Sequence, residues 1–194
     1  MAQKFYISDC HFGHANVIGF DKRPFADVEE MDRCMMEYWN QCVQKEDEVY
    51  IIGDFQYRSD KGPVWYLQRL KGKKYLIIGN HDEKTLKYPG ALDYFESVEK
   101  MMHVNDNGKQ LCLCHFPICE WNGYYRDSYH LFGHIHAKLA DTCLIMRNRK
   151  NAYNTAACIN NYRPSTLEEV IANNKRFVEQ NPLSWRELPP TALK

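Results

Sequence analysis

The chain of 194 residues contains no apolar run near the roughly 18 residues that a membrane-spanning helix requires. It also has no excess charge of either sign, because Lys+Arg and Asp+Glu both count 25. A formal net charge of zero gives no electrostatic reason to expect nucleic acid or an anionic membrane as the main partner.

The chain also lacks any C-x-x-C pair, although it contains eight cysteines. It is too long for a disulfide-stapled miniprotein, and its first residues lead straight into a strand pattern instead of a cleavable signal peptide. We therefore predict reduced, mostly buried thiols and a cytoplasmic location. The sequence leaves the oligomeric state open.

No repeat, low-complexity stretch or linker divides the chain, and its length favours one core. We expect a single domain over residues 1–180 and a C-terminal tail over 181–194, which is Pro-bearing and irregular. Strand and helix patterns alternate at first, then strands dominate, and a helix closes the domain. This order predicts an α/β fold with layered, mixed sheets.

Three helices have recognisable starts or stops. One begins at Asp27, with Glu30 at the capping-box spacing. A shorter one covers 63–70, and the last is capped by Ser165 with Glu168 as its partner. Five later strands are expected at 98–104, 110–114, 131–133, 142–146 and 153–158.

Several apolar, strand-like runs end on residues of the kind that bind metals. The residues at these ends are Asp9 and His11, Asp54, Asn80-His81-Asp82, His115, and His134 with His136. In an open α/β sheet, ligands gather just past the carboxyl ends of the strands. The five segments therefore predict one shared site, and the number of ligands suits two metal ions better than one.

The spacing within these segments is informative. In Asp9-Cys10-His11, and again from His134 to His136, side chains two residues apart face the same side of an extended chain. Carboxylate and imidazole groups together suit Mn, Fe, Zn, Ni or Co. Each segment alone is a weak indication, but the order D-x-H, G-D, G-N-H-D, H, G-H-x-H is a specific pattern.

These residues resemble the calcineurin-like metallophosphoesterases, and the resemblance runs from Tyr6 to about Val170. The stretches similar to a branch of small bacterial and phage members are Ser8-Asp9-Cys10-His11-Phe12-Gly13-His14, Arg23-Pro24-Phe25, Tyr38-Trp39-Asn40 and Tyr162-Arg163-Pro164. The resemblance implies a four-layer α/β/β/α sandwich of two mixed sheets flanked by helices. It also implies a dinuclear metal centre at the edge of the sheets.

The resemblance further assigns a role to each position. It implies that the first metal is held by Asp9, His11 and His136, the second by Asn80, His115 and His134, and that Asp54 bridges both. Manganese is the expected ion, with Fe, Zn, Ni or Co as alternatives. A hydroxide shared by the two ions attacks phosphorus, and His81 assists as the catalytic histidine. Asp82 is expected to make local hydrogen bonds or to cap a helix.

One departure from the family pattern concerns the partner of His81. Tyr57 stands where the family often carries Asp or Asn, so the sequence leaves that partner open. Arg58 is equally well a surface arginine or a phosphate clamp with bidentate hydrogen bonds. His14, three residues after His11, is expected to border the metals as a contact to a metal ligand or to substrate, with a hydrogen bonder at the start of a helix as the alternative.

The pattern favours a phosphodiesterase acting on small or nucleotide-type esters, because no cap insertion is evident and an open site accommodates diesters. A phosphomonoesterase, or a non-catalytic metal-binding interaction protein on the same fold, is the alternative. A structural zinc module is a third interpretation, and its ligands would be Cys112, Cys114, His115 and Cys119. Their spacing does not match that of zinc knuckles.

Overall fold

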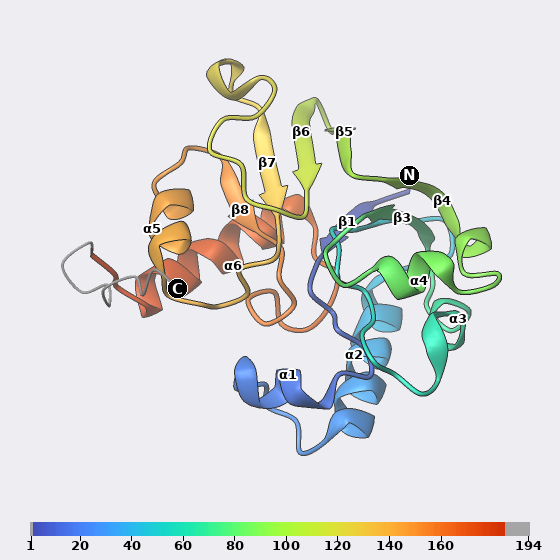
Figure 1. The fold of residues 1–194 in the computed structure, drawn as a ribbon. Coiled ribbons are helices and arrows are strands. Elements are labelled where there is room, and N and C mark those ends of the chain that lie inside the picture. The colour runs from blue at the N-terminus through green and yellow to red at the C-terminus, as the bar shows by residue number, and fades with distance from the viewer. Residues whose placement is uncertain (1, 185–194) are drawn as a thin grey trace.

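The computed structural model describes residues 2–184, which form two four-stranded sheets packed face to face (Figure 1). The first sheet is parallel throughout and contains β1 (Lys4–Ile7), β2 (Glu48–Ile51), β3 (Lys73–Ile77) and β4 (Phe95–Glu99), in that order. The second contains β5 (Met101–Asp106), β6 (Lys109–Cys114), β7 (Tyr129–Phe132) and β8 (Ala152–Asn154). It is mixed, because β5 pairs antiparallel with β6 whereas the other pairs are parallel.

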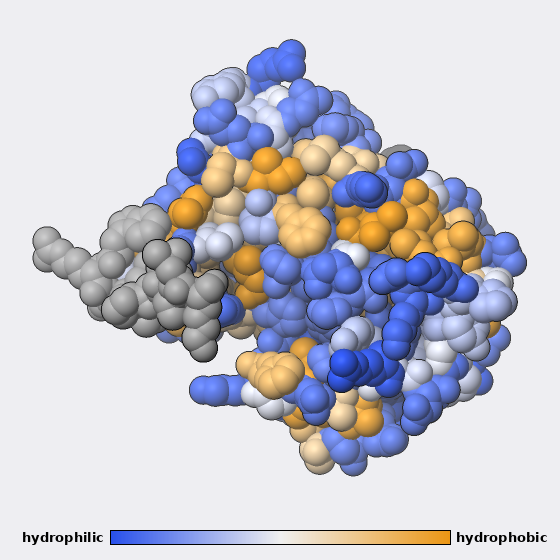
Figure 2. Space-filling view, in the orientation of Figure 1, coloured by the Kyte–Doolittle hydropathy of each residue, from blue (hydrophilic) through white to orange (hydrophobic). Residues whose placement is uncertain are grey.

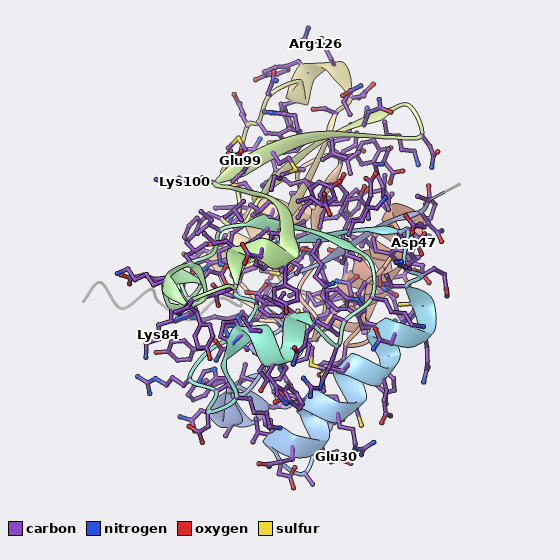
Figure 3. The ribbon with its side chains drawn as sticks, turned by 90° about the vertical axis from the view of Figure 1, so that its right-hand side faces the viewer. Glu30, Asp47, Lys84, Glu99, Lys100 and Arg126 are labelled. Atoms are coloured by element: carbon purple, nitrogen blue, oxygen red, sulfur yellow. The ribbon has the colours of Figure 1, made fainter. Side chains whose placement is uncertain are left out.

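The chain passes from the first sheet to the second at Glu99 and Lys100, which are labelled in Figure 3. The sequence predicted one strand over 98–104, and this prediction is wrong. Lys100 separates two strands that pair with different neighbours, β4 with β3 and β5 with β6. Local pattern cannot reveal such a division, because both parts have strand-like sequences.

Helices cover the outer faces of both sheets (Figure 1). The helices are α1 (Ala15–Phe20), α2 (Val28–Cys42), α3 (Gly62–Leu67), α4 (Glu83–Lys87), α5 (Asp141–Arg147) and α6 (Leu167–Gln180), with the short 3-10 turns η1 (Leu92–Tyr94) and η2 (Tyr124–Arg126).

Alternate residues of the central strands enter two different apolar layers. In β2, Val49 and Ile51 pack toward α2 and α3, whereas Tyr50 faces the second sheet. Strands buried on both faces read as continuous apolar runs, which explains their appearance in the sequence. On the far face of the second sheet, Cys112 packs with Met146 of α5. The layers therefore run helix, sheet, sheet, helix, and the predicted four-layer sandwich is confirmed.

The start of α2 is also confirmed. The Asp27 carboxylate accepts a hydrogen bond of 2.8 Å from the backbone N–H of Glu30. The Glu30 carboxylate in turn accepts from the N–H of Ala26, one residue before the expected position. The shorter helix over 63–70 is confirmed in place but ends early, because α3 stops at Leu67.

The cap of the last helix was predicted one residue too early. Thr166 caps α6, and its reciprocal partner is Glu169 instead of Glu168. Ser165 is unavailable because its backbone N–H and C=O both pair with Tyr6 of β1. Tertiary pairing therefore moves the start of the helix by one position.

The expected strand over 142–146 is wrong, because this segment is the helix α5. A short apolar run such as Cys143-Leu144-Ile145-Met146 fits either structure, and packing on the outer face of the second sheet selects the helix. The strand expected over 153–158 ends at Asn154, and only Ala156 continues with an isolated bridge to Ser8.

Within residues 2–184, no helix has both the length and the apolar character needed to cross a membrane. The expected tail over 181–194 lies outside the described residues from position 185 onward.

Candidate metal centre

The parallel strands bring their carboxyl ends to one edge, and the predicted ligands lie just past these ends. Asp9 follows β1, Asp54 follows β2 and Asn80 follows β3. From the second sheet, His115 directly follows β6 and His134 follows β7. In Figure 1, the arrowheads of β6 and β7 point to the middle of the molecule, above α1. The structure therefore gathers side chains from both sheets at one place.

Most of these residues have an unusual backbone. The five with left-handed backbone are Asp9 (φ 53°), His11 (φ 52°), Asp54 (φ 56°), His134 (φ 70°) and His136 (φ 49°). Such a conformation is uncommon for residues other than glycine, although Asp and His adopt it more readily than most. Each instance costs of order 1–3 kcal/mol and persists only when surrounding contacts impose it. Its concentration here is typical of a functional site.

The first ligand cluster consists of Asp9, His11 and His136, whose ligand atoms lie close enough together to hold one ion. The Nε2 atom of His136 is 3.3 Å from Oδ1 of Asp9 and 3.2 Å from Nε2 of His11. Burial lowers the pKa of His11 to about 3, so its imidazole is neutral and offers a lone pair. We refer to these three residues as the first cluster.

The environment of His136 favours a cation. Burial alone would lower its pKa, but hydrogen bonds to the carboxylates of Asp21 and Asp9 raise the pKa to about 10. Nδ1 of His136 donates to Asp21 at 2.8 Å, which directs Nε2 toward Asp9 and His11. The carboxylates of Asp9 and Asp21 stabilise a positive charge beside the His136 ring. A metal ion bound at Nε2 of His136 would be stabilised in the same way as the proton is.

The second ligand cluster consists of Asn80, His115 and His134. Nδ1 of His115 donates to the Ile52 carbonyl oxygen at 2.9 Å, which orients the ring with Nε2 toward the other two residues. This Nε2 lies 3.1 Å from Oδ1 of Asn80, itself an acceptor. Nδ1 of His134 is 2.9 Å from the same oxygen. The three side chains thus offer two nitrogens that each lie within 3.1 Å of one oxygen, a ligand set that could hold a cation.

Asp54 lies between the two clusters. Its Oδ2 is 3.7 Å from Nε2 of His11 and 3.6 Å from Nε2 of His115. Burial raises the pKa of its carboxyl, although the neighbouring His115 opposes the shift, and Asp9 adds to it. The backbone N–H of His81 donates to Oδ1 at 2.8 Å and fixes the orientation of the carboxylate. The described residues thus fit two cations with one shared carboxylate.

Two glycines allow these carboxylates to approach the neighbouring backbone. A Cβ on Gly79 would lie 2.3 Å from Oδ1 of Asp54, and one on Gly133 would lie 2.5 Å from Oδ2 of Asp9. Neither distance is sterically acceptable. The Gly-Asn and Gly-His steps of the sequence pattern therefore have a packing reason.

Asp21 and Arg23 support the first cluster, and sequence reasoning missed this role. The Arg23 guanidinium donates to the backbone carbonyl oxygens of Asp9 and Cys10 at 2.9 and 2.8 Å. It also donates to Oδ2 of Asp21 at 3.0 Å. A metal-ligating histidine usually donates its other nitrogen to a carboxylate, so a partner for His136 was to be expected. Nothing in the sequence identified Asp21, because the two residues are 115 positions apart.

Asp82 was expected to cap a helix or to make local hydrogen bonds. Its side chain does not cap α4, and only its bond with Gly79 is local. Its carboxylate accepts backbone N–H groups of Asp54, Phe55 and Gly79 at 2.8–2.9 Å. These bonds hold together the segments that follow β2 and β3. Asp82 therefore stabilises the loop that carries Asp54.

His81 lies beside the first cluster, with its ring 5.5 Å from that of His11. In the part of the chain that the structure describes, its side chain has no hydrogen-bond partner. The Tyr57 ring lies 4.4 Å from it instead. Tyr57 therefore takes the place of the hydrogen-bonding residue that the family often has, and its contact with His81 is between rings.

His14 and Arg58 border the same place. The His14 ring packs 4.8 Å from the Tyr57 ring. The guanidinium of the exposed residue Arg58 lies over the same Tyr57 ring, 5.0 Å from its centre. Both residues line an open cleft of about 1340 Å³ whose lining includes His81 and His134. Their location fits contact with a substrate, and that role stays a prediction.

The zinc-module interpretation does not fit the structure. Among residues 2–184, the cysteines at 112, 114 and 119 form no metal-binding group with His115. Cys112 packs in an apolar cluster and Cys119 is exposed. Cys10 is buried, and burial raises the pKa of its thiol, so it is inert as a nucleophile.

The α/β fold of this chain combines two sheets with imidazole, amide and carboxylate side chains gathered past the ends of their strands. Such a combination is typical of a metal-binding class of proteins. The family model described as calcineurin-like phosphoesterase matches residues 5–152 of this chain. The chain therefore belongs to the calcineurin-like phosphoesterase family, and the resemblance seen in the sequence is confirmed.

Relatives occur in an archaeon and in a phage. An uncharacterized protein of Methanocaldococcus jannaschii is 30% identical over 173 residues, which cover 88% of this chain and 90% of that protein. The Gene 66 protein of Mycobacterium phage D29 is 29% identical over 165 residues, covering 72% and 81% of the two chains. A solved structure of a protein of unknown function from Aquifex aeolicus has a TM-score of 0.69 at 24% identity, covering 89% of this chain and 99% of that one. This last similarity shows that the fold is shared.

Proposed function

We propose that this protein is a dinuclear metal-dependent phosphoester hydrolase with a preference for phosphodiesters, either small or of the nucleotide type. The observation that carries the proposal is the position of Asp54, whose Oδ2 lies at nearly equal distances from an imidazole of each cluster. A carboxylate placed in this way is suited to bridge two ions. Manganese is the proposed metal because carboxylate and amide oxygens belong to both ligand sets, and Fe, Zn, Ni or Co, which the imidazoles also suit, are the alternatives.

In this proposal each cluster holds one ion. The first would be held by Asp9, His11 and His136, the second by Asn80, His115 and His134, with Asp54 shared. Two divalent ions, when bound, supply Lewis acidity toward the phosphate oxygens and activate water for attack on phosphorus.

The surrounding side chains would orient the phosphate and handle the proton. His81 lines the cleft, beside His11, and would contact the phosphate and donate a proton to the leaving oxygen. Because no hydrogen bond within the described residues fixes the His81 ring, its orientation would depend on Tyr57 and on the phosphate itself.

The open cleft supports a diester substrate, because a diester carries a group on each side of phosphorus and needs space in both directions. A phosphomonoesterase remains the second candidate function. A non-catalytic metal-binding interaction protein is the third, and turnover separates it from the other two.

The test is hydrolysis of p-nitrophenyl phosphate and bis-p-nitrophenyl phosphate by metal-stripped protein, with and without added Mn²⁺. We expect Mn²⁺-dependent turnover that is faster with the diester. His81→Ala should keep its metal and lose about 10²–10⁴-fold in kcat, which is the usual contribution of general acid–base catalysis.

Faster turnover of the monoester would support the phosphomonoesterase. Bound Mn²⁺ without any turnover would overturn the enzymatic proposal, and normal activity of His81→Ala would overturn the role of that residue. Tyr125→Ala, at an exposed aromatic residue that is not part of the cleft lining, is the matched control.

A further inference from the structure

Two exposed phenylalanines line the cleft. Phe20 ends α1 with 76% of its surface exposed, and Phe116 follows β6 with 45% exposed. The Phe20 ring lies 6.3 Å from the ring of His14, whereas the Phe116 ring lies 4.8 Å from that of His134. Figure 2 shows a hydrophilic band between apolar surface over α1 and apolar surface near the ends of β6 and β7. Single exposed aromatics are ordinary, but two across one cleft call for a ligand with flat, apolar parts.

The charge of the cleft differs from that of the whole chain. Lys22, Arg58 and Lys138 line it and are exposed. Among the described lining residues, Asp21 is the only carboxylate, and it is bonded to Arg23 and His136. A chain with a formal net charge of zero therefore presents a basic cleft, which suits a ligand with several negative charges.

The cleft is also larger than one small ester needs. Its volume is about 1340 Å³, whereas pockets for small molecules and cofactors measure roughly 300–1,000 Å³. Phe20 borders the first cluster through His14, whose ring lies 5.6 Å from that of His11. Phe116 borders the second cluster, with its ring 5.1 Å from that of His115. A phosphodiester bound over both clusters would therefore extend toward a phenylalanine on each side.

We propose that the substrate is a single-stranded oligonucleotide. Its scissile phosphodiester would lie over the metal ligands, its neighbouring bases would stack on Phe20 and Phe116, and its flanking phosphates would meet the three cations. Aromatic platforms beside a basic groove are the general means of binding single strands without sequence preference. In the reaction, water forms a new bond to phosphorus, the bond from phosphorus to the leaving sugar oxygen breaks, and that oxygen takes up a proton. This inference rests on the proposed hydrolytic function.

The test uses the full chain loaded with Mn²⁺ and measures competitive inhibition of bis-p-nitrophenyl phosphate hydrolysis. The inhibitors are tetrathymidylate, tetrauridylate and an abasic tetramer with the same phosphates. We expect the base-bearing tetramers to inhibit at least about tenfold more strongly than the abasic one, as stacking of one base implies. The ratio between the two base-bearing tetramers distinguishes a DNA strand from an RNA strand.

Variants locate the stacking. Phe20→Ala and Phe116→Ala should each raise the inhibition constant of tetrathymidylate about tenfold and leave that of the abasic tetramer nearly unchanged. Phe20→Trp should retain strong inhibition, whereas Phe20→Leu, which keeps apolar bulk without a ring, should not. Tyr125→Ala, an 82% exposed aromatic that is absent from the cleft lining, is the control and should behave as the unmodified chain.

The outcomes separate this inference from the proposed function. Turnover of bis-p-nitrophenyl phosphate with equal inhibition by the base-bearing and abasic tetramers would overturn the inference alone. Stronger inhibition by a phosphotyrosine peptide than by tetrathymidylate would do the same. Absence of Mn²⁺-dependent turnover would remove the proposed function, and the inference with it.

Discussion

The two ligand clusters differ in how deeply the fold buries them. In the first, Asp9 and His11 are 0% and 3% exposed. His136, the third residue of that cluster, has 20% of its side chain exposed. In the second cluster only His115 is buried, whereas Asn80 and His134 are exposed, and His134 lines the cleft. The first cluster therefore has a buried base and reaches the cleft through His11 and His136, whereas the second presents two exposed side chains.

Their supporting contacts differ in the same way. The first cluster is held from behind, because Asp21 fixes His136 and Arg23 fixes both Asp21 and the backbone of Asp9. In the second, Asn80 and His134 lie against each other, and the Ile52 carbonyl anchors only His115. If each cluster holds an ion, as proposed, this contrast predicts that the ion of the second cluster exchanges more readily with solvent.

The largest change in metal content should come from Asp54→Asn, which removes the negative charge shared by both clusters. We expect each ion to bind more than roughly 100-fold more weakly, exceeding the usual effect of an outer-shell carboxylate. Metal analysis after gel filtration should then find fewer than two Mn²⁺ ions per chain. Asp93→Asn, at an exposed position in η1, is the control. Two ions retained in Asp54→Asn would contradict a bridging role.

Asp21→Asn should lower metal affinity by less than Asp54→Asn, and only at the first cluster. The amide can still hydrogen-bond Nδ1 of His136, but the charge that favours a cation is lost, so the first ion should bind about 10–100-fold more weakly. Calorimetric titration with Mn²⁺ measures both sites, and the second should be unchanged. Asp21→Glu should restore part of the affinity. Equal weakening of both sites would show that the clusters are not independent.

The smallest effect concerns the order of metal release. Under excess chelator, Mn²⁺ should leave in two phases, with the second cluster emptying first because Asn80 and His134 are exposed. His134→Ala should remove the fast phase, and His11→Ala the slow one. Stopped-flow measurement with a coloured chelator resolves the two. A fast phase that persists in His134→Ala would reverse the proposed assignment.

Sequence pattern was most informative where local chemistry and tertiary structure agree. Asp27 caps α2 as predicted, because a capping side chain and its N–H partner are three residues apart and need no other part of the chain. It failed where distant pairing decided the outcome. Ser165 pairs with β1 instead of capping α6, and residues 142–146 form a helix because the outer face of the second sheet accommodates one.

The same division applies to the candidate site. The expected gathering of the seven ligand positions followed from a strand-end rule, which depends only on several parallel strands sharing one sheet edge. Their roles as metal ligands stay a proposal. The ring contact between Tyr57 and His81, and the basic lining of the cleft, depend on which surface loops meet.

By itself, the sequence determined the family, the layered α/β architecture and the set of polar residues at the strand ends. These follow from short-range patterns of apolar and polar residues, which the chain carries before it folds. Only the tertiary structure decided that Asp21 supports His136, that the second cluster is more exposed than the first, and that Phe20 and Phe116 line one cleft. Such contacts join residues far apart in the chain, and their formation depends on the packing of whole layers, which no local pattern encodes.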